Sequence, residues 1–182
     1  MELMDAIKGR RSVRAYRRDV VPDEMVQRVL EALQWAPSWA NTQCWEVIVV
    51  RDDETRRKLA DTLSPKNPAR EGIVQAPLTL VLIGIEGKAG FKGGVTCTDK
   101  GDWYMFDVAL AMQNLCLAAH GMGLGTVIVG LFDAQEVART LHVPQGRAVV
   151  AMTPLGVPDK VPSPPKRKEI SELVYHETYG RR

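Results

Sequence analysis

The stretch Asp102–His120, DWYMFDVALAMQNLCLAAH, predicts the longest helix of the chain and the centre of its fold. Its apolar residues occupy nearly the whole circumference, which is typical of a buried spine or a subunit contact. Asp107 and Asn114 interrupt this pattern and need polar partners, because an unpaired buried polar group is costly. Glycines at 121 and 123 are expected to end the helix.

The strands around this helix are predicted from apolar and β-branched runs. Pro77–Ile85 is apolar nearly throughout and indicates a central strand covered on both faces. Trp45–Val50 is expected to be a buried strand, and Gly125–Gly130 and Arg147–Leu155 are expected to supply two more.

Capping signals mark further helices. Pro22 with two following acids opens a helix that Pro37 closes, Asp52 caps a second, and Asp133 begins a third that runs to Leu141. Four strands mixed with four or five helices indicate an α+β or α/β fold, and 182 residues suit one domain over 1–182.

Composition excludes several function classes. A net charge of +2 is too small to favour nucleic acid or a membrane surface as a partner. The cysteines have no paired spacing and, without a secretory signal, indicate reduced thiols in a cytoplasmic protein. The histidines stand alone, so no metal site is expected.

The clearest chemical signal is the basic run Gly9–Arg14. In an extended chain Arg10, Ser12 and Arg14 would share one face, and guanidinium and hydroxyl donors suit a phosphate. The alternative is a solvated basic cluster. A second cluster of basic residues, Lys166-Arg167-Lys168, favours the phosphate interpretation.

Three glycine-rich or proline-rich stretches are expected to form turns, loops or extended chain. Gly121–Gly125 follows a helix and opens a strand, the reverse of a dinucleotide fingerprint, so we expect a turn and helix cap. Glu86–Gly101 is expected to be a loop of the kind that can act as a lid. Prolines from 158 to 165 predict an extended arm.

Four motifs in this order resemble the nitroreductase family of FMN-dependent oxidoreductases over nearly the full length. They are Arg10-Arg11-Ser12-Val13-Arg14; Ala36-Pro37-Ser38 with Asn41, Gln43 and Trp45; Asp107 with Gln113-Asn114, Leu117-Ala118-Ala119 and Gly123-Leu124-Gly125-Thr126; and Pro154-Leu155-Gly156 with Arg167-Lys168 and Tyr179-Gly180. Cys44 replaces the usual proline, and Trp39 replaces a small residue and is expected to narrow the pocket it lines.

The resemblance implies an α+β, three-layer sandwich with a mixed central sheet flanked by helices and a C-terminal arm reaching the partner subunit. It implies FMN at the interface of a homodimer, with hydride passing from NAD(P)H through flavin N5 to a small organic acceptor such as a nitro compound or quinone. A non-enzymatic flavin-binding or redox-sensing protein is the alternative, and a relative that destroys flavin or dehalogenates tyrosines is a further one.

The resemblance also implies the cofactor-binding residues, with no catalytic side chain because the flavin carries the hydride. Arg14 would lie near flavin N1 and the C2 carbonyl as an electrostatic stabiliser. Asn67 and Arg70 would reach the ring, Ile128, Val129 and Gly130 would run near N5, and the turn residues would come from the partner subunit. The phosphate would be held by Arg10, Ser12 and Arg167, beside Arg11 and Lys168, and the turn residues are Pro37, Ser38, Trp39 and Asn41.

Overall fold

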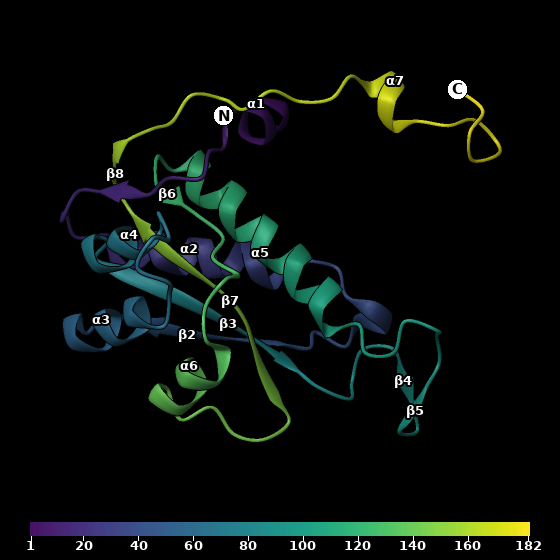
Figure 1. Ribbon diagram of the computed structural model, residues 1–182, viewed down its shortest axis with the longest axis horizontal. Helices are drawn as coiled ribbons and strands as arrows, with labels where there is room; N and C mark the ends of the chain where they lie inside the picture. The colour runs from purple at the N-terminus through teal and green to yellow at the C-terminus, as the bar shows by residue number, and fades with distance from the viewer.

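A four-stranded sheet of order β2–β3–β7–β6 forms the centre of the computed structural model, which describes residues 1–182 (Figure 1). The strands are β2 (Trp45–Val50), β3 (Leu78–Ile85), β6 (Gly125–Thr126) and β7 (Arg147–Gly156). Neighbouring strands are antiparallel. A parallel bridge between Ser12 and Thr126 adds mixed character at the β6 edge.

β3 is the central strand that the sequence predicts, and all of its residues are buried. Its Leu82 lies opposite Val47 of β2 and Ala151 of β7. The prediction that β2 is buried is wrong, because β2 has a neighbour on one side only and Val49 is 37% exposed.

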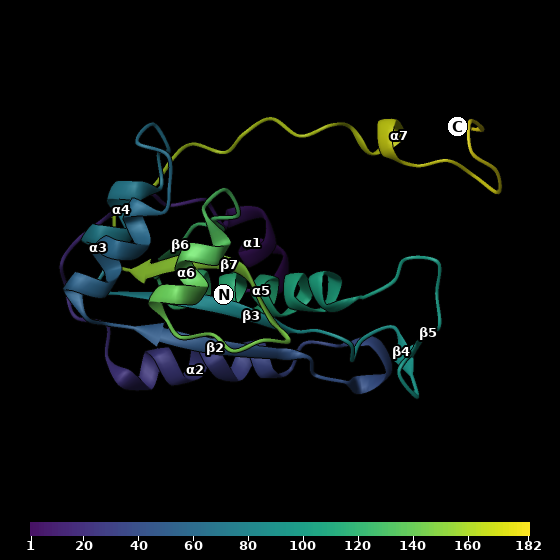
Figure 2. The same cartoon turned by 60° about the horizontal axis from the view of Figure 1, so that its bottom comes forward.

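Helices cover both faces of the sheet in three layers (Figure 2). On one face, α2 (Asp23–Gln34) and α5 (Tyr104–Gly121) pack against Leu78, Leu80 and Leu82 of β3. On the other, α3 (Asp53–Asp61), α4 (Arg70–Gln75) and α6 (Ala134–Thr140) enclose a second core that contains Val81 and Ile83. Alternate residues of one strand therefore serve two cores, which confirms the α+β sandwich.

The predicted caps are present. The Asp52 carboxylate accepts a hydrogen bond from the Thr55 N–H at 2.7 Å, and Asp133 accepts one from the Glu136 N–H at 2.9 Å. α5 ends at Gly121, and Gly123 follows with φ of 77°, a left-handed turn that favours glycine. The interpretation of this glycine run as a turn and cap is confirmed.

Several short elements were not predicted because they are too short to show periodicity. They are α1 (Leu3–Gly9), α4, the pair β1 (Ala15–Tyr16) and β8 (Pro158–Lys160), and a hairpin of β4 (Phe91–Lys92) and β5 (Val95–Thr96) inside the expected loop. The strand expected over 125–130 ends at Thr126, and only Val129 pairs again, with Met152.

The proline-rich arm leaves the sheet after β8 and runs outward to α7 (Ile170–Leu173) and the C-terminus (Figures 1 and 2). Ile170 and Leu173 are 77% and 61% exposed. The arm has little to pack against within one copy of the chain. No helix of the structure has the length and apolarity needed to cross a bilayer.

Candidate cofactor site

The predicted phosphate motif lies at the C-terminal end of α5. A Cβ added at Gly9 would be 2.7 Å from Nε2 of His120, so α1 ends in direct contact with α5. Arg10 and Arg11 line a cavity of about 250 Å³ whose other walls include His120 and Thr126. Arg10, Arg11 and Val13 of the basic run therefore line a cavity, whereas Ser12 and Arg14, expected on the same face as Arg10, are not among its lining residues.

The arginines of this motif are left without acidic partners. Arg11 Nη1 donates to the backbone carbonyls of Lys8 at 2.6 Å and of Arg10 at 2.8 Å. Arg14 Nη1 donates to the Ser12 carbonyl at 3.3 Å. No ion pair of the structure includes any of the three arginines. Arg10 and Arg11 line the cavity, and uncompensated cations there fit the phosphate of FMN.

His120 also lines this cavity, although no motif in the sequence includes it. Burial, followed by the positive charges of Arg10 and Arg11, lowers the pKa of His120 below its ordinary value. Both effects favour the neutral imidazole. Only its spatial position beside Gly9 reveals its role, because it stands alone in the sequence.

The motif is fixed by β6. The Val13 N–H donates to the Thr126 carbonyl at 2.9 Å, next to the bridge between Ser12 and Thr126. A Cβ at Gly125 would lie 2.9 Å from the side chain of Val13. Glycine is thus required at 125 for the close approach that holds the basic run in place.

The second group of predicted residues lies beside Arg14, on α4 and the segment before it. A Cβ at Gly72 would be 2.9 Å from the Arg14 carbonyl oxygen, so α4 packs directly on the basic run. Asn67 Nδ2 donates to the Leu131 carbonyl at 3.3 Å, next to Ile128–Gly130. In that segment Ile128 is 49% exposed, whereas Val129 is buried.

Arg70 is committed elsewhere. Its Nη2 forms an ion pair with Asp61, and its Nε donates to the Ala60 carbonyl at 3.2 Å. Two of the three nitrogens of its guanidinium are therefore engaged within the protein and not free for the predicted contact with a flavin ring. Arg167 and Lys168 are exposed on the arm and are not among the residues lining the cavity with Arg10.

The predicted turn residues are organised by Asp107 at the other end of α5. The Trp39 N–H donates to both carboxylate oxygens of Asp107, each at 3.1 Å, and the Cys44 thiol donates to Oδ2 at 3.3 Å. Burial and the bond to Asp107 raise the pKa of Cys44 to about 11. Cys44 thus replaces a proline with a thiol that stabilises the turn.

This turn has unusual backbone geometry and lines an apolar pocket. Asn41 and Gln43 have φ values of 54° and 47°, and Ser38 Oγ accepts from the Gln43 N–H at 2.9 Å. A pocket of about 320 Å³ is formed by turn and α5 residues, namely Pro37, Ser38, Trp39, Trp103, Phe106, Asp107 and Leu110. Trp39 is one of its lining residues, whereas Asn41 is exposed and does not line it.

A family model described as the nitroreductase family matches residues 7–71 and 63–157, most of the chain. The chain belongs to the nitroreductase family. It contains no group of three His, Cys, Asp or Glu side chains that could hold a metal ion.

Relatives of this nitroreductase-family chain are named for several activities. An NADH dehydrogenase of Thermus thermophilus is 28% identical over 199 residues, covering 96% of this chain and 95% of that protein. A 5,6-dimethylbenzimidazole synthase of Rhodospirillum rubrum is 32% identical over 174 residues, covering 85% and 82%. The crystal structure of a nitroreductase family protein from Clostridium novyi NT has 28% identity and a TM-score of 0.79, covering 100% and 96%.

These comparisons confirm the family, the fold and the class of enzyme expected from the sequence. Relatives named for FMN and for NAD(P)H confirm the expected cofactor and hydride donor at the level of the family. The individual site residues and the acceptor remain predictions.

Proposed function

We propose that this nitroreductase-family chain is an FMN-dependent oxidoreductase that passes hydride from NAD(P)H to a small organic acceptor, a nitro compound or quinone. The active form is a homodimer with two sites, each built from both subunits. We place this one-domain chain in the cytoplasm, where Cys44, Cys97 and Cys116 stay reduced; none of them forms a disulfide.

The proposal rests on two groups of predicted site residues that lie far apart along α5, the cavity with Arg10 near one end and the turn with Trp39 near the other. Gly9 and Arg10 lie at His120, whereas Trp39 is bonded to Asp107. Thirteen helical positions separate Asp107 from His120, a distance of about 20 Å at 1.5 Å per residue. A two-fold dimer with antiparallel α5 helices would bring the cation cavity of one subunit beside the aromatic pocket of the other.

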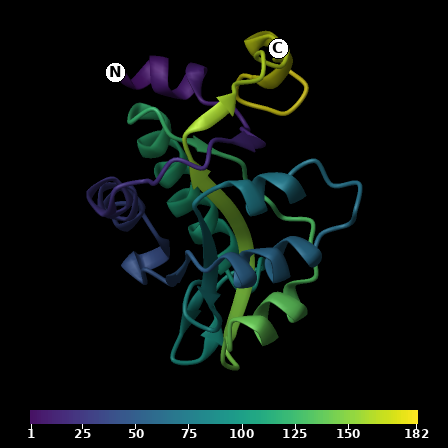
Figure 3. The ribbon, with the colours of Figure 1, turned by 90° about the vertical axis from the view of Figure 1, so that its left-hand side faces the viewer.

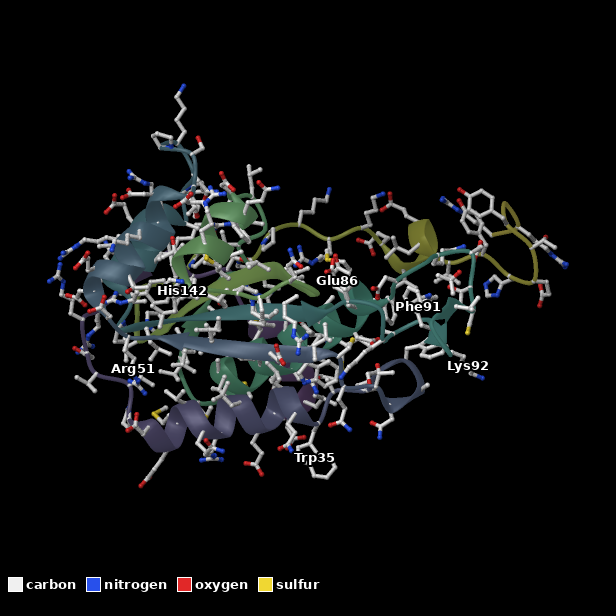
Figure 4. The ribbon with its side chains drawn as sticks, turned by 90° about the horizontal axis from the view of Figure 1, so that it is seen from below. Trp35, Arg51, Glu86, Phe91, Lys92 and His142 are labelled. Carbon is white, nitrogen blue, oxygen red and sulfur yellow. The ribbon has the colours of Figure 1, made fainter.

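Exposed apolar side chains supply a surface for this dimer. Met105 and Phe106 of α5 are 54% and 55% exposed, and Leu3 of α1 is 67% exposed. Trp35 projects from the end of α2 away from the sheet and is 79% exposed (Figure 4). Large exposed apolar side chains on α1 and α5 favour a subunit contact. The outward arm with Ile170 and Leu173 would reach the partner.

The chain's residues then have distinct tasks. Arg10, Arg11 and Ser12, with Arg167 and Lys168 from the arm, would hold the phosphate. Arg14 would place positive charge beside the ring, Asn67 and the backbone of Ile128–Gly130 would border it, and Pro37, Ser38, Trp39 and Asn41 would cover it from the partner. Bound FMN supplies the hydride-transfer chemistry; the apolar pocket excludes water and orients a flat acceptor.

The direct test is spectroscopic and kinetic. We expect the purified protein to bind FMN with a flavin absorption spectrum, to bleach on adding NADH or NADPH, and to recover on adding a nitroarene or quinone. Steady turnover distinguishes an enzyme from a non-enzymatic flavin sensor, which would keep the spectrum without turnover. Failure to bind FMN at all would contradict the proposal.

The relative named 5,6-dimethylbenzimidazole synthase supports a second candidate function. In that case the flavin itself would be consumed. Incubation of the protein with FMN, NAD(P)H and oxygen, followed by mass spectrometry for 5,6-dimethylbenzimidazole, separates the two. Stable flavin over many turnovers supports the acceptor reductase; loss of flavin with formation of that product supports the synthase.

A further inference from the structure

A second basic cavity, lined by none of the proposed flavin-site residues, lies between α3, α4 and the segment that follows β1. α3 and α4 are the blue helices facing the viewer in Figure 3. The cavity has a volume of about 250 Å³, and its polar lining consists of Arg18, Asp53, Arg56, Arg57 and Gln75. None of these residues belongs to the nitroreductase motifs described above.

Arg56 forms a fixed cationic wall of this cavity. It is only 5% exposed, and its Nη1 donates to the carbonyls of Val74 at 2.8 Å and Ile73 at 3.3 Å, at the end of α4. Its Nη2 pairs with Asp53, and its buried Nε has no hydrogen-bond partner. A cation at a helix C-terminus is stabilising, so Arg56 is held in place whether or not a ligand is bound.

Arg18 and Arg57 are available for a ligand. Both are exposed, and neither forms an ion pair or a side-chain hydrogen bond within the protein. The adjacent Arg17, by contrast, pairs with Asp19 at 2.7 Å. The charge of Arg17 is thus compensated by an ion pair, whereas the charges of Arg18 and Arg57, which line the cavity, are not.

Gln75 adds a neutral donor. Its Oε1 accepts from the Tyr16 N–H at 3.2 Å, which fixes the side chain and leaves its amide NH₂ without a protein partner. The cavity therefore presents three guanidinium groups and one amide against a single carboxylate. Guanidinium forks match the oxygen pairs of phosphate, and a dianion best compensates the excess positive charge.

We infer that this cavity is a second anion site that binds a phosphate dianion, either free phosphate or a phosphate monoester. The site goes beyond the proposed function and uses none of its residues. Arg18 and Arg57 supply the ligand contacts, Arg56 supplies fixed positive charge, and Gln75 supplies a positioned donor.

The test is calorimetric titration of the FMN-saturated protein with inorganic phosphate in a phosphate-free buffer. Wild type should bind one phosphate per subunit, and the double variant Arg18→Gln/Arg57→Gln should bind it at least tenfold more weakly. Arg28→Gln/Lys92→Gln is the matched control, because it removes two exposed, unpaired cations elsewhere and should bind like wild type.

A parallel titration with glycerol 3-phosphate distinguishes the two sources of the ligand. Binding of both compounds assigns the site to monoesters as well, whereas binding of phosphate alone restricts it to the free anion. The inference is overturned if wild type shows no saturable phosphate binding, or if the double variant binds phosphate as tightly as the control does. Phosphate that bound in the Arg10 cavity would still bind to the double variant. Such binding therefore could not be mistaken for binding at the cavity of Arg18 and Arg57.

Discussion

The backbone N–H of Trp39 donates to both carboxylate oxygens of Asp107 at 3.1 Å, across 68 positions of sequence. Asp107 is 1% exposed and also accepts from the Cys44 thiol. The buried carboxylate of Asp107 therefore attaches this turn to α5. The turn carries the residues that are proposed to contact the flavin of the partner subunit.

Asp107→Ala should destabilise the fold by about 3 kcal/mol, because it leaves buried donors without an acceptor. Urea unfolding measures the change. Asp99→Ala is the control, since Asp99 is exposed and pairs only with Lys100, and its loss should cost about 0–1 kcal/mol. Equal losses in the two variants would contradict a structural role for the buried carboxylate.

Gly72→Ala should lower stability by about 1–3 kcal/mol, because the new Cβ would lie 2.9 Å from the backbone oxygen of Arg14. Gly121→Ala provides a matched comparison, since no atom lies within 4 Å of its added Cβ and alanine favours a helix. The midpoint temperature of thermal unfolding should therefore be lower for Gly72→Ala than for wild type, and equal to or slightly higher than wild type for Gly121→Ala. The reverse ranking would mean that α4 does not pack tightly on the basic run.

Arg14→Gln should lower the two-electron potential of the bound FMN by about 30 mV, which corresponds to about 1.4 kcal/mol of differential interaction. The cation favours the form of the cofactor that carries more negative charge. Arg14 forms no ion pair in the structure, and the nearby carboxylate of Asp19 pairs with Arg17 instead. A dye-coupled titration at equal FMN saturation measures the potential.

Arg14→Lys is the control for this experiment, because it retains the charge and should retain most of the potential. A fully loaded Arg14→Gln protein with the wild-type potential would remove Arg14 from the redox site and leave it a surface residue.

His120 should make the flavin-free protein less stable as pH falls below about 6.5. Its pKa is lowered in the fold, first by burial and then by Arg10 and Arg11, so the unfolded chain binds the extra proton more readily. The stability is therefore present above the ordinary histidine pKa and declines below it. The free energy of unfolding, measured with urea at pH 7.5, 6.5 and 5.5, should decline less steeply for His120→Gln than for wild type. Parallel declines in the two proteins would exclude this contribution of His120.

The sequence was most informative where a pattern repeats along one element. Continuous apolarity identified β3 as the buried central strand, and the all-round apolarity of α5 identified the spine. Asp107 was recognised as needing a partner. Its identity could not be predicted, because the partner is a backbone N–H brought near by the fold.

The candidate site was predictable only in part for the same reason. Arg10 and Ser12 stand out in a motif, but the contributions of His120 and Gly72 depend on elements that are distant in sequence. Arg70 shows the opposite case, since the family resemblance suggested a flavin contact from this loop, whereas the structure pairs it with Asp61.

The central claim, that each flavin site is shared between subunits, is tested most directly by a mixed dimer. Arg10→Ala removes a phosphate contact and should weaken FMN binding about ten- to hundredfold. Pro37→Glu places a carboxylate on the exposed turn that would cover the ring from the partner. Each variant alone should form a dimer that binds FMN poorly at both sites.

In a heterodimer of these two variants, purified with a different tag on each chain, one site combines both defects and the other combines two wild-type halves. The account predicts one tightly bound FMN per heterodimer, measured by fluorescence titration. Heterodimers that bind no FMN with wild-type affinity would contradict it, because that result is expected if each site lies within a single subunit.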